Sequence, residues 1–434
     1  MKTVISAGGK GTRISSVACD IPKPMITILG KSVLEYQIET LQKQGFDDII
    51  ITVGHLGEKI KDYFGDGSGI SSVTGKPFGV KIEYYEENEP LGTAGALLKL
   101  KDKLTDDFLF INGDLFFDAD LKKLCSFHKR KNAAATVFTH PNSHPFDSTL
   151  IVADKNNRVT EFITKENRTA FYKNRVNTGI HILSKGIFSF VQEKFPLDLD
   201  RDILIPIAEN GGLYCIDTAE YIKDMGTPER YEAVINDIQN GIPGKLSSAT
   251  KRKAVFLDRD GTLNIYKGFL RDINDLELCD GAAEAVKKIN DNGYIAVVVT
   301  NQPVIARGEV TENELSNIHN KLETLLGENG AVLNAIYYCP HHPDKGFDGE
   351  IAELKTECDC RKPKAGLLKT AAEDFNIDLA ESFTVGDSQN DILAGKNAGT
   401  KTILIGNEDF GQDFTVRSLK EATDIIFGEK ENEQ

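Results

Sequence analysis

The chain has 434 residues, of which 40 % are hydrophobic and 27 % are charged, a composition typical of a globular protein with more than one domain. Its formal net charge of −15 argues against nucleic acid as a partner, although small phosphorylated molecules need only local cations and backbone amides. The longest apolar runs are too short to span a membrane, and the N-terminal sequence lacks a signal-peptide pattern. We therefore expect a cytoplasmic protein that does not bind membranes; its oligomeric state stays open.

Short β-branched runs alternate with amphipathic helical stretches along the whole chain. In the first half, strands are predicted at 2–7, 48–54, 80–85 and 108–113, and a helix at 32–45. In the second half, strands are predicted at 254–258, 294–301, 383–387 and 400–406. This alternation predicts an α/β protein with two Rossmann-like domains and mainly parallel sheets. Residues 239–252 are rich in Gly, Pro, Ser and Lys and predict a linker between domains 1–238 and 253–434.

A glycine-rich turn, "SAGGKGTR" at 6–13, follows the first predicted strand. Such a turn lets backbone N–H groups approach an anion closely, and Lys10 and Arg13 add positive charge. The dinucleotide fingerprint requires a third glycine where Ile14 stands, and the P-loop requires a different ending, so the turn fits neither motif. A tight turn without a ligand is the alternative.

Three further stretches favour a phosphate site. Lys23 lies between two prolines, which restrict the backbone and hold the lysine on a stiff segment. Asp114 ends a predicted buried strand at the edge where open α/β sheets bind ligands. Asp224 precedes a Gly-Thr-Pro helix start. Two carboxylates of this kind suit Mg²⁺ together with substrate phosphates.

In order and spacing, "AGGKGTR", "PKPM", "PLGTAGAL", "NGD", "NTGIHIL" and "DMGTPERY" resemble the sugar-nucleotidyltransferase family over residues 1 to about 238. The resemblance implies transfer of a nucleoside monophosphate from an NTP to a sugar 1-phosphate. Arg13 and Lys23 would then neutralise the triphosphate, and Asp114 and Asp224 would hold Mg²⁺. The implied nucleotide contacts are Gly8, Gly9, Gly11, Thr12 and Gly92, and the implied sugar contacts are Lys165 and Asn177. Thr164 replaces a glutamate that contacts the sugar in many members, which argues against the commonest hexose 1-phosphates.

In the second half, "FLDRDGT" places Asp258 and Asp260 at the end of a hydrophobic strand, before a glycine turn. Paired carboxylates there could be an acid–base pair, a metal site, or a nucleophile with an acid beside it. A capped strand end with exposed aspartates is the alternative. The stretches "VVTNQ", "CRKPK" and "VGDSQND" follow in order, and the whole set resembles the haloacid-dehalogenase-type phosphatases over 253 to about 428.

That resemblance implies that Asp258 attacks the phosphoryl group and forms an aspartyl-phosphate. Asp260 would protonate the leaving oxygen and later activate water, a step that a halide leaving group would not need. The residues implied to support these steps are Thr300, Asn301 and Lys362 at the phosphoryl group and Asp258, Asp260 and Asp387 at Mg²⁺. The stretch from Thr262 to Thr300 is too short for a large inserted cap domain, so we expect an open site for small soluble phosphates.

Three of the seven cysteines lie in the loop 339–360, as Cys339-x-His341 and Cys358-x-Cys360. Two such pairs suit tetrahedral Zn²⁺, and a closed site of four protein ligands is structural. Its expected use is to set Arg361 and Lys362 at the phosphate. His342 is an alternative nitrogen ligand, and buried thiols beside a surface His-His pair are the alternative without metal.

"FLDRDGTLN", "TNQPVIARG" and the cysteine loop match the phosphatase subgroup that includes heptose 1,7-bisphosphate 7-phosphatases; histidinol-phosphate phosphatases carry a similar loop. Pro303-Val304 departs from that subgroup, which usually has Ser-Gly there. The resemblances together imply a bifunctional enzyme that makes a heptose 1-phosphate and then activates it, with GTP as the expected nucleotide because the first half looks most like mannose- and heptose-type guanylyltransferases. Alternatives are a different sugar, histidinol phosphate, or a half that only binds sugar phosphates for regulation.

Overall fold

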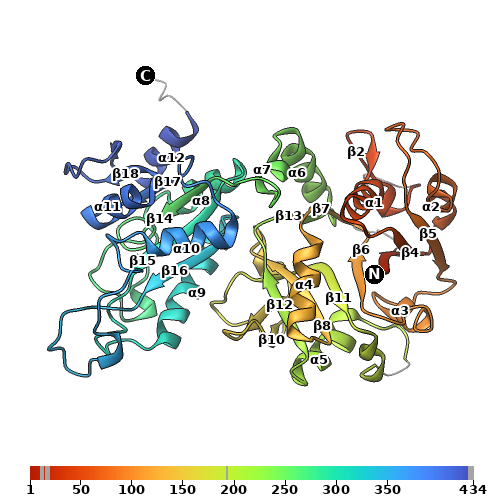
Figure 1. Ribbon diagram of the computed structural model, residues 1–434, viewed down its shortest axis with the longest axis horizontal. Coiled ribbons are helices and arrows are strands. Elements are labelled where there is room, and N and C mark those ends of the chain that lie inside the picture. The colour runs from red at the N-terminus through yellow and green to blue at the C-terminus, as the bar shows by residue number, and fades with distance from the viewer. Residues whose placement is uncertain (10–13, 15–19, 192–193, 429–434) are drawn as a thin grey trace. The chain divides into compact units, whose positions relative to one another are not determined.

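The computed structural model describes residues 1–9, 14, 20–191 and 194–428 (Figure 1). The chain forms two compact units, which are described separately. Unit 1 contains residues 1–140, 151–163 and 177–243, and unit 2 contains 141–150, 164–176 and 244–434. The change of unit after Pro243 falls within the predicted linker, where the structure also has a short helix, α7 (Ile242–Leu246). Two short segments of the first half, 141–150 and 164–176, belong to unit 2.

Unit 1 contains a nine-stranded sheet whose central strands are parallel. Its main path runs β10 (Val159–Ile163), β9 (Leu150–Ala153), β11 (Val176–Leu183), β6 (Phe108–Asn112), β1 (Thr3–Ala7), β4 (Asp48–Val53) and β5 (Lys81–Glu86); β8 (Ala135–His140) and β12 (Leu213–Asp217) complete it. The strand β1 pairs in parallel with β4 and β6, whereas β11 runs antiparallel to β6. Two-stranded ribbons pair β7 (Leu115–Asp118) with β13 (Tyr221–Asp224) and β2 (Thr27–Ile28) with β3 (Lys31–Ser32).

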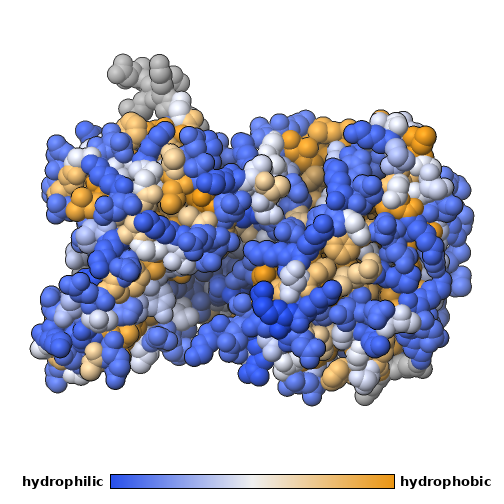
Figure 2. All heavy atoms as spheres, in the orientation of Figure 1, coloured by the Kyte–Doolittle hydropathy of each residue, from blue (hydrophilic) through white to orange (hydrophobic). Residues whose placement is uncertain are grey.

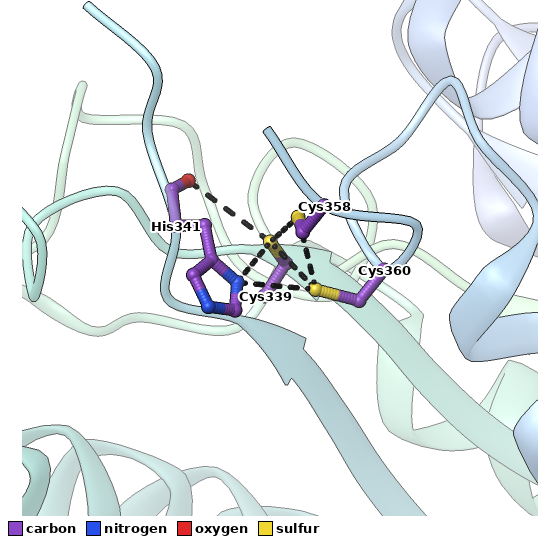
Figure 3. A group of neighbouring side chains, drawn as sticks. All are labelled: Cys339, His341, Cys358 and Cys360. Carbon is purple, nitrogen blue, oxygen red and sulfur yellow. Dashed lines mark hydrogen bonds between the residues drawn. The ribbon is translucent and has the colours of Figure 1, made fainter. Parts of the chain in front are cut away.

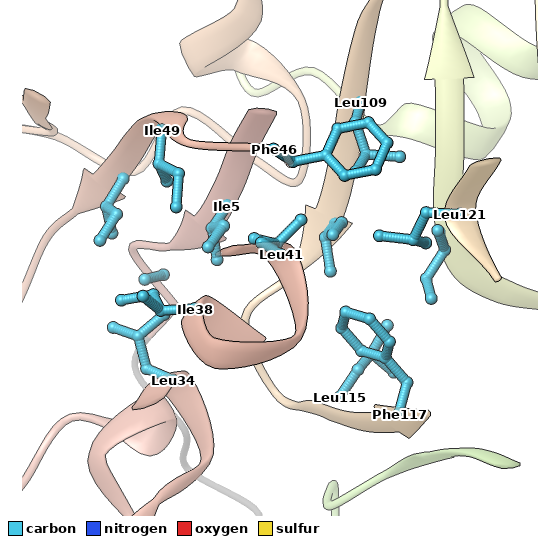
Figure 4. Packing of buried hydrophobic residues seen from close by; sticks show 14 of the residues in the cluster. Ile5, Leu34, Ile38, Leu41, Phe46, Ile49, Leu109, Leu115, Phe117 and Leu121 are labelled. Carbon is cyan, nitrogen blue, oxygen red and sulfur yellow. The ribbon is translucent and has the colours of Figure 1, made fainter. Parts of the chain in front are cut away.

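The helix α1 (Val33–Gln44) shows how the sequence builds the core of unit 1. The Ser32 side chain caps its N-terminus by accepting from the Glu35 N–H, and Gly45 ends it in a left-handed conformation with φ of 84°. Leu34, Ile38 and Leu41 share one face of the helix and are buried. They pack with residues of β1, β4 and β6, including Ile5, Ile49 and Leu109 (Figure 4). The other helices of unit 1 are α2 (Gly57–Phe64), α3 (Gly95–Lys99), α4 (Leu121–Lys131), α5 (Ile205–Glu209) and α6 (Pro228–Gln239).

Unit 2 is built on a six-stranded sheet in which every pairing is parallel. Its order is β16 (Ala335–Cys339), β15 (Ile295–Asn301), β14 (Ala254–Leu257), β17 (Phe383–Gly386), β18 (Lys401–Ile405) and β19 (Phe414–Val416). Its helices are α8 (Ala282–Asp291), α9 (Glu312–Glu328), α10 (Gly366–Phe375), α11 (Gln389–Ala398) and α12 (Leu419–Phe427). The continuous apolar run of β14 is buried throughout, as expected for a central parallel strand covered on both faces. The predicted fold class, α/β with mainly parallel sheets, is confirmed.

Hydrophilic side chains cover most of the face shown in Figure 2, with hydrophobic residues scattered among them. Within the described ranges, no helix is both long enough and apolar enough to cross a membrane.

Candidate functional site

In unit 1, Lys23 and Asp114 lie side by side at the carboxyl end of β6. The Gly113 N–H donates to the Ser6 carbonyl at 2.9 Å, and a Cβ at Gly113 would lie 3.2 Å from the Pro24 ring. The glycine therefore lets the segment of Pro22 to Pro24 pack closely against the strand end. Lys23, held in the short turn η2 (Lys23–Met25), directs its Nζ to the Asp114 carboxylate.

Asp224 lies close to Asp114 along the backbone, because β13 pairs with β7 and the Met225 N–H donates to the Asp114 carbonyl at 3.0 Å. Its carboxylate accepts from Arg230 at 2.9 Å and from the Gly226 N–H at 2.8 Å. Each of the two carboxylates thus holds a cationic side chain. Their shared role at Mg²⁺ stays a prediction.

The predicted nucleotide loop is described only in part: Gly8 and Gly9 lie within the described residues, whereas Gly11, Thr12 and Arg13 lie outside them. A Cβ at Gly8 would lie 2.5 Å from Oε1 of Glu87, so the glycine allows this carboxylate to approach the loop. Burial raises the pKa of Glu87. Glu87 was not predicted from the sequence.

Gly92 has a positive φ of 87°, and a Cβ there would lie 2.4 Å from the Leu197 carbonyl oxygen. That oxygen accepts from the Ala94 N–H at 3.1 Å, and the Leu197 N–H donates to Leu91 at 2.8 Å. Only glycine combines this conformation with such close backbone approach.

Asn177, on β11, forms a short polar chain. Its Nδ2 donates to Asp200 at 3.1 Å, and its Oδ1 accepts from the Gly179 N–H at 3.0 Å and from His181 Nε2 at 2.9 Å. Burial lowers the pKa of His181 to about 3 and, with help from a neighbouring aspartate, raises the pKa of Asp200 to about 6. Lys165, the other predicted sugar contact, is exposed on segment 164–176 of unit 2. Sugar contact stays a prediction for both residues.

In unit 2, Lys362 lies at the centre of a cluster of carboxylates. Its Nζ donates to Asp258 at 2.7 Å, to Asp391 at 2.5 Å and to the Val299 carbonyl at 2.7 Å, and its side chain is only 5 % exposed. Burial raises the pKa of Asp258 to about 7, even though Lys362 acts in the opposite direction. Burial together with Asp391 raises the pKa of Asp387 to about 6.

Oxygen atoms of Asp258, Asp387 and Asp391 all lie within 4.8 Å of one another. Carboxylate oxygens are the ligands that Mg²⁺ prefers, so this donor set fits the predicted ion. The predicted ligand Asp260 is not part of the group: its carboxylate accepts from Arg259 at 2.8 Å and from Gln302 at 2.9 Å. Asp391 is the third carboxylate of the group instead. Its Oδ1 accepts from Lys362, and its Oδ2 accepts from the Ser388 hydroxyl at 2.5 Å.

Thr300 and Asn301 end β15 beside these carboxylates. Asn301 exchanges two hydrogen bonds with the Lys362 backbone, each of 3.0 Å, so its amide holds this lysine in place. The Thr300 hydroxyl accepts from Gln302 at 2.9 Å. The contact that each residue makes with a phosphoryl group stays a prediction.

The cysteine loop brings its predicted ligands together (Figure 3). Sulfur–sulfur distances among Cys339, Cys358 and Cys360 are 3.2 to 3.5 Å, and His341 Nδ1 lies 3.3 Å from the Cys360 sulfur. Zn²⁺ with bonds of about 2.3 Å separates two tetrahedral sulfur ligands by about 3.8 Å, close to this spacing. His342, the alternative ligand, instead contacts Arg307 through Nε2 at 3.3 Å. The geometry therefore fits zinc with His341 as the nitrogen ligand.

Arg361 follows directly after this cluster and donates to the His341 carbonyl at 3.1 Å. The Gly366 N–H donates to the Asp359 carbonyl at 3.0 Å, which closes a tight turn around Lys362. Two of the four grouped residues, Cys358 and Cys360, therefore lie on the same short segment of backbone as the buried lysine.

Comparison with known proteins separates the two halves. Residues 2–241 match the family described as nucleotidyl transferase. The second half is 47 % identical over 176 residues to the D-glycero-beta-D-manno-heptose-1,7-bisphosphate 7-phosphatase of Haemophilus ducreyi, covering 40 % of this chain and 93 % of that one. The chain belongs to the nucleotidyl transferase family and to the family of this 7-phosphatase. The phosphatase half also resembles the enzyme of that name from Pasteurella multocida, at 42 % identity over 40 % of this chain and 91 % of the other, and residues 359–427 match the HAD-hydrolase-like family.

Two solved structures resemble the separate halves. HddC from Yersinia pseudotuberculosis is 28 % identical to the transferase half, with a TM-score of 0.46 and coverage of 55 % of this chain and 99 % of that one. The D,D-heptose 1,7-bisphosphate phosphatase from B. bronchiseptica, complexed with magnesium and phosphate, is 28 % identical to the phosphatase half, with a TM-score of 0.36 and coverage of 41 % and 99 %.

Proposed function

We propose that the protein is a bifunctional enzyme that removes the 7-phosphate of D-glycero-D-manno-heptose 1,7-bisphosphate and then transfers GMP from GTP to the resulting heptose 1-phosphate. The observation that carries the proposal is that one chain joins a nucleotidyl transferase domain to a domain closely related to heptose bisphosphate 7-phosphatases. The first reaction yields a sugar 1-phosphate, the substrate class that a sugar nucleotidyltransferase consumes.

In the phosphatase half, the proposed nucleophile is Asp258. Its carboxylate oxygen forms a bond to phosphorus as the bond from phosphorus to the C7 oxygen breaks, and Asp260 gives a proton to the departing oxygen. Asp260 then takes a proton from a water molecule that attacks the aspartyl-phosphate, which releases phosphate and restores Asp258. Bound Mg²⁺ would offset the charge that develops on the phosphoryl oxygens. Lys362 adds a fixed cation from within 2.7 Å of the nucleophile.

The zinc in this proposal is structural. The close spacing of the three sulfurs supports a bound cation, because three thiolates at 3.2 to 3.5 Å would repel one another strongly without one. Metal binding would fix the loop immediately before Arg361 and Lys362. The four ligands leave no position for a catalytic water.

In the transferase half, an oxygen of the sugar 1-phosphate attacks the α-phosphorus of GTP and pyrophosphate leaves. Such a reaction needs positioning and charge stabilisation more than protein covalent chemistry. Lys23, paired with Asp114, supports this assignment, since a cation and a carboxylate at one strand end suit a triphosphate with Mg²⁺. The choice of guanine follows from the sequence resemblance alone.

The test is a one-pot reaction with Mg²⁺, heptose 1,7-bisphosphate and each NTP separately, followed by mass spectrometry. We expect GDP-heptose with GTP. Asp258→Asn should abolish phosphate release and GDP-heptose formation from the bisphosphate but keep transfer to supplied heptose 1-phosphate. Asp114→Asn should keep phosphate release but abolish GDP-heptose formation from both substrates. Phosphate release without nucleotide sugar would refute the transferase substrate, and no phosphate release would refute the heptose assignment and direct attention to histidinol phosphate.

A further inference from the structure

Arg259 stands between Asp258 and Asp260 in the sequence. Its side chain is among the largest that are fully buried in the described part of the chain, with no exposed surface. Its guanidinium donates twice to Asp260 Oδ1, at 3.1 and 3.2 Å, and once to Asp260 Oδ2, at 2.8 Å. It also donates to Gln302 Oε1 at 3.0 Å and to His319 Nε2 at 3.2 Å. Most of these bonds lead to Asp260 or to Gln302, which itself donates to Asp260.

The His319 contact fixes the far side of the guanidinium. This histidine belongs to α9, its ring lies 5.8 Å from that of Tyr338, and its Nε2 faces Arg259. Burial, and then the charge of Arg259, lower the pKa of His319 well below its usual value. A neutral imidazole offers Nε2 as an acceptor, so the ring accepts from Arg259 and limits its rotation.

Gln302 extends the network to the phosphoryl side. Its Oε1 accepts from Arg259, while its Nε2 donates to Asp260 Oδ2 and to the Thr300 hydroxyl, both at 2.9 Å. Asn264 adds a further donor to Asp260 at 3.1 Å. The carboxylate is thereby held from several sides before any substrate arrives.

Burying a guanidinium is costly unless its partners are well placed, and an apolar side chain could fill the same volume at lower cost. The arginine offers what an apolar residue lacks: a fixed orientation for Asp260 and a positive charge beside the carboxylate that remains after a proton is given away. Both effects act on proton transfer to the leaving group.

We propose that Arg259, held by His319, is a positioning residue for the general acid–base Asp260. The inference rests on the proposed function of Asp260 in phosphate release. It goes beyond that function because it assigns the orientation of the acid to a buried residue and to a helix that need not touch the substrate.

The test compares leaving groups. An alkoxide from a sugar phosphate needs a proton as it departs, whereas 4-nitrophenolate needs almost none. A variant that loses acid catalysis should therefore lose kcat/KM on the sugar phosphate and keep most of it on the nitrophenyl ester. For Arg259→Gln we expect kcat/KM to fall about 100-fold on heptose 1,7-bisphosphate, in line with the size of general acid catalysis, and less than about fivefold on 4-nitrophenyl phosphate. Asp260→Asn provides the reference pattern.

A matched control is Arg252→Gln. Arg252 is also buried in unit 2, at 4 % exposure, but its guanidinium donates to the carbonyls of Leu246 and Phe375, away from the carboxylates. This variant should affect both substrates equally. His319→Leu and His319→Gln form a second pair that leaves Arg259 itself intact: the leucine variant should show the selective loss, and the glutamine variant, which keeps an acceptor, should recover most of it.

Selective loss in Arg259→Gln and His319→Leu, with recovery in His319→Gln, would support the inference. If Asp260→Asn is selective but Arg259→Gln and His319→Leu lower both substrates equally, the positioning role is refuted while the acid role of Asp260 stands. If Asp260→Asn is itself not selective, the acid role fails, and the inference fails with it.

Discussion

Replacing Lys362 with methionine should expose how strongly one buried cation stabilises the carboxylates around it. The methionine keeps most of the apolar volume but removes the three contacts to Asp258, Asp391 and Val299. Removing one partner of a buried ion pair costs about 3–5 kcal/mol, because the remaining charge stays buried without compensation. We expect a loss of that size in the unfolding free energy of unit 2 at pH 9.

This loss of unfolding free energy should become smaller as pH falls. In the native protein the pKa of Asp258 is about 7, and without Lys362 it must rise further. Where the folded variant has bound this proton and the folded native protein has not, the difference in unfolding free energy between them narrows by about 1.4 kcal/mol per pH unit as pH falls toward 7. Below pH 7 the native Asp258 binds the same proton and the gap stops narrowing.

Scanning calorimetry of the zinc-loaded, magnesium-free protein at several pH values measures this difference in unfolding free energy between the native protein and Lys362→Met. In a separate assay, phosphate release should fall at least about 100-fold in the variant. Lys355→Met is the matched control: Lys355 is also buried, but its partner Glu350, at 3.4 Å, is partly exposed and has a lowered pKa, chiefly from a backbone hydrogen bond. Its destabilisation should not change between pH 9 and pH 7. A pH-independent gap for Lys362→Met would refute the reasoning.

Two further outcomes are expected. The affinity of the phosphatase site for Mg²⁺ should fall about twentyfold from pH 8 to pH 6, because protons compete with the ion at Asp258 and Asp387, whose pKa values are about 7 and about 6. Titration calorimetry on the native protein and on Asp258→Asn measures this affinity. A constant affinity of the native protein would contradict the prediction. Gly92→Ala should lower the unfolding temperature of unit 1, since its Cβ would meet a backbone oxygen at 2.4 Å. Gly69→Ala, whose Cβ would meet nothing within 4 Å among the described residues, should not, and equal unfolding temperatures would contradict the close approach.

Strand positions were predictable because continuous runs of β-branched residues are typical of strands that are buried on both faces of a parallel sheet. The predicted strands at 254–258 and 294–301 are observed as Ala254–Leu257 and Ile295–Asn301. Strand direction was less accessible: β11 runs antiparallel to β6, and periodicity carries no information on direction. The assignment of 164–176 to unit 2 likewise depends on tertiary contacts, such as the Tyr172 N–H donating to Thr324 at 3.0 Å.

The group of Cys339, His341, Cys358 and Cys360 was predictable because its members lie in two short sequence pairs, and His341 rather than His342 joins the three cysteines, as expected. The residues that escaped prediction act through distant partners. Glu87 approaches Gly8 only in the folded chain, and Arg259 looks in sequence like a spacer between two aspartates. A spacer pattern cannot reveal that the side chain is buried. Asp391 is different: the motif "VGDSQND" already points to it as an aspartate at a strand end, and only its place in the carboxylate group was not predicted.

Charge balance explains why the phosphatase carboxylates separate into two groups. Asp258, Asp387 and Asp391 share one cation, Lys362, so when all three are ionised the group keeps two negative charges, which matches one divalent ion. Asp260 is neutralised separately by Arg259. A divalent cation would therefore balance the first group, whereas the second group needs none. The Asp260 carboxylate can thus keep its orientation while the charge of the first group changes.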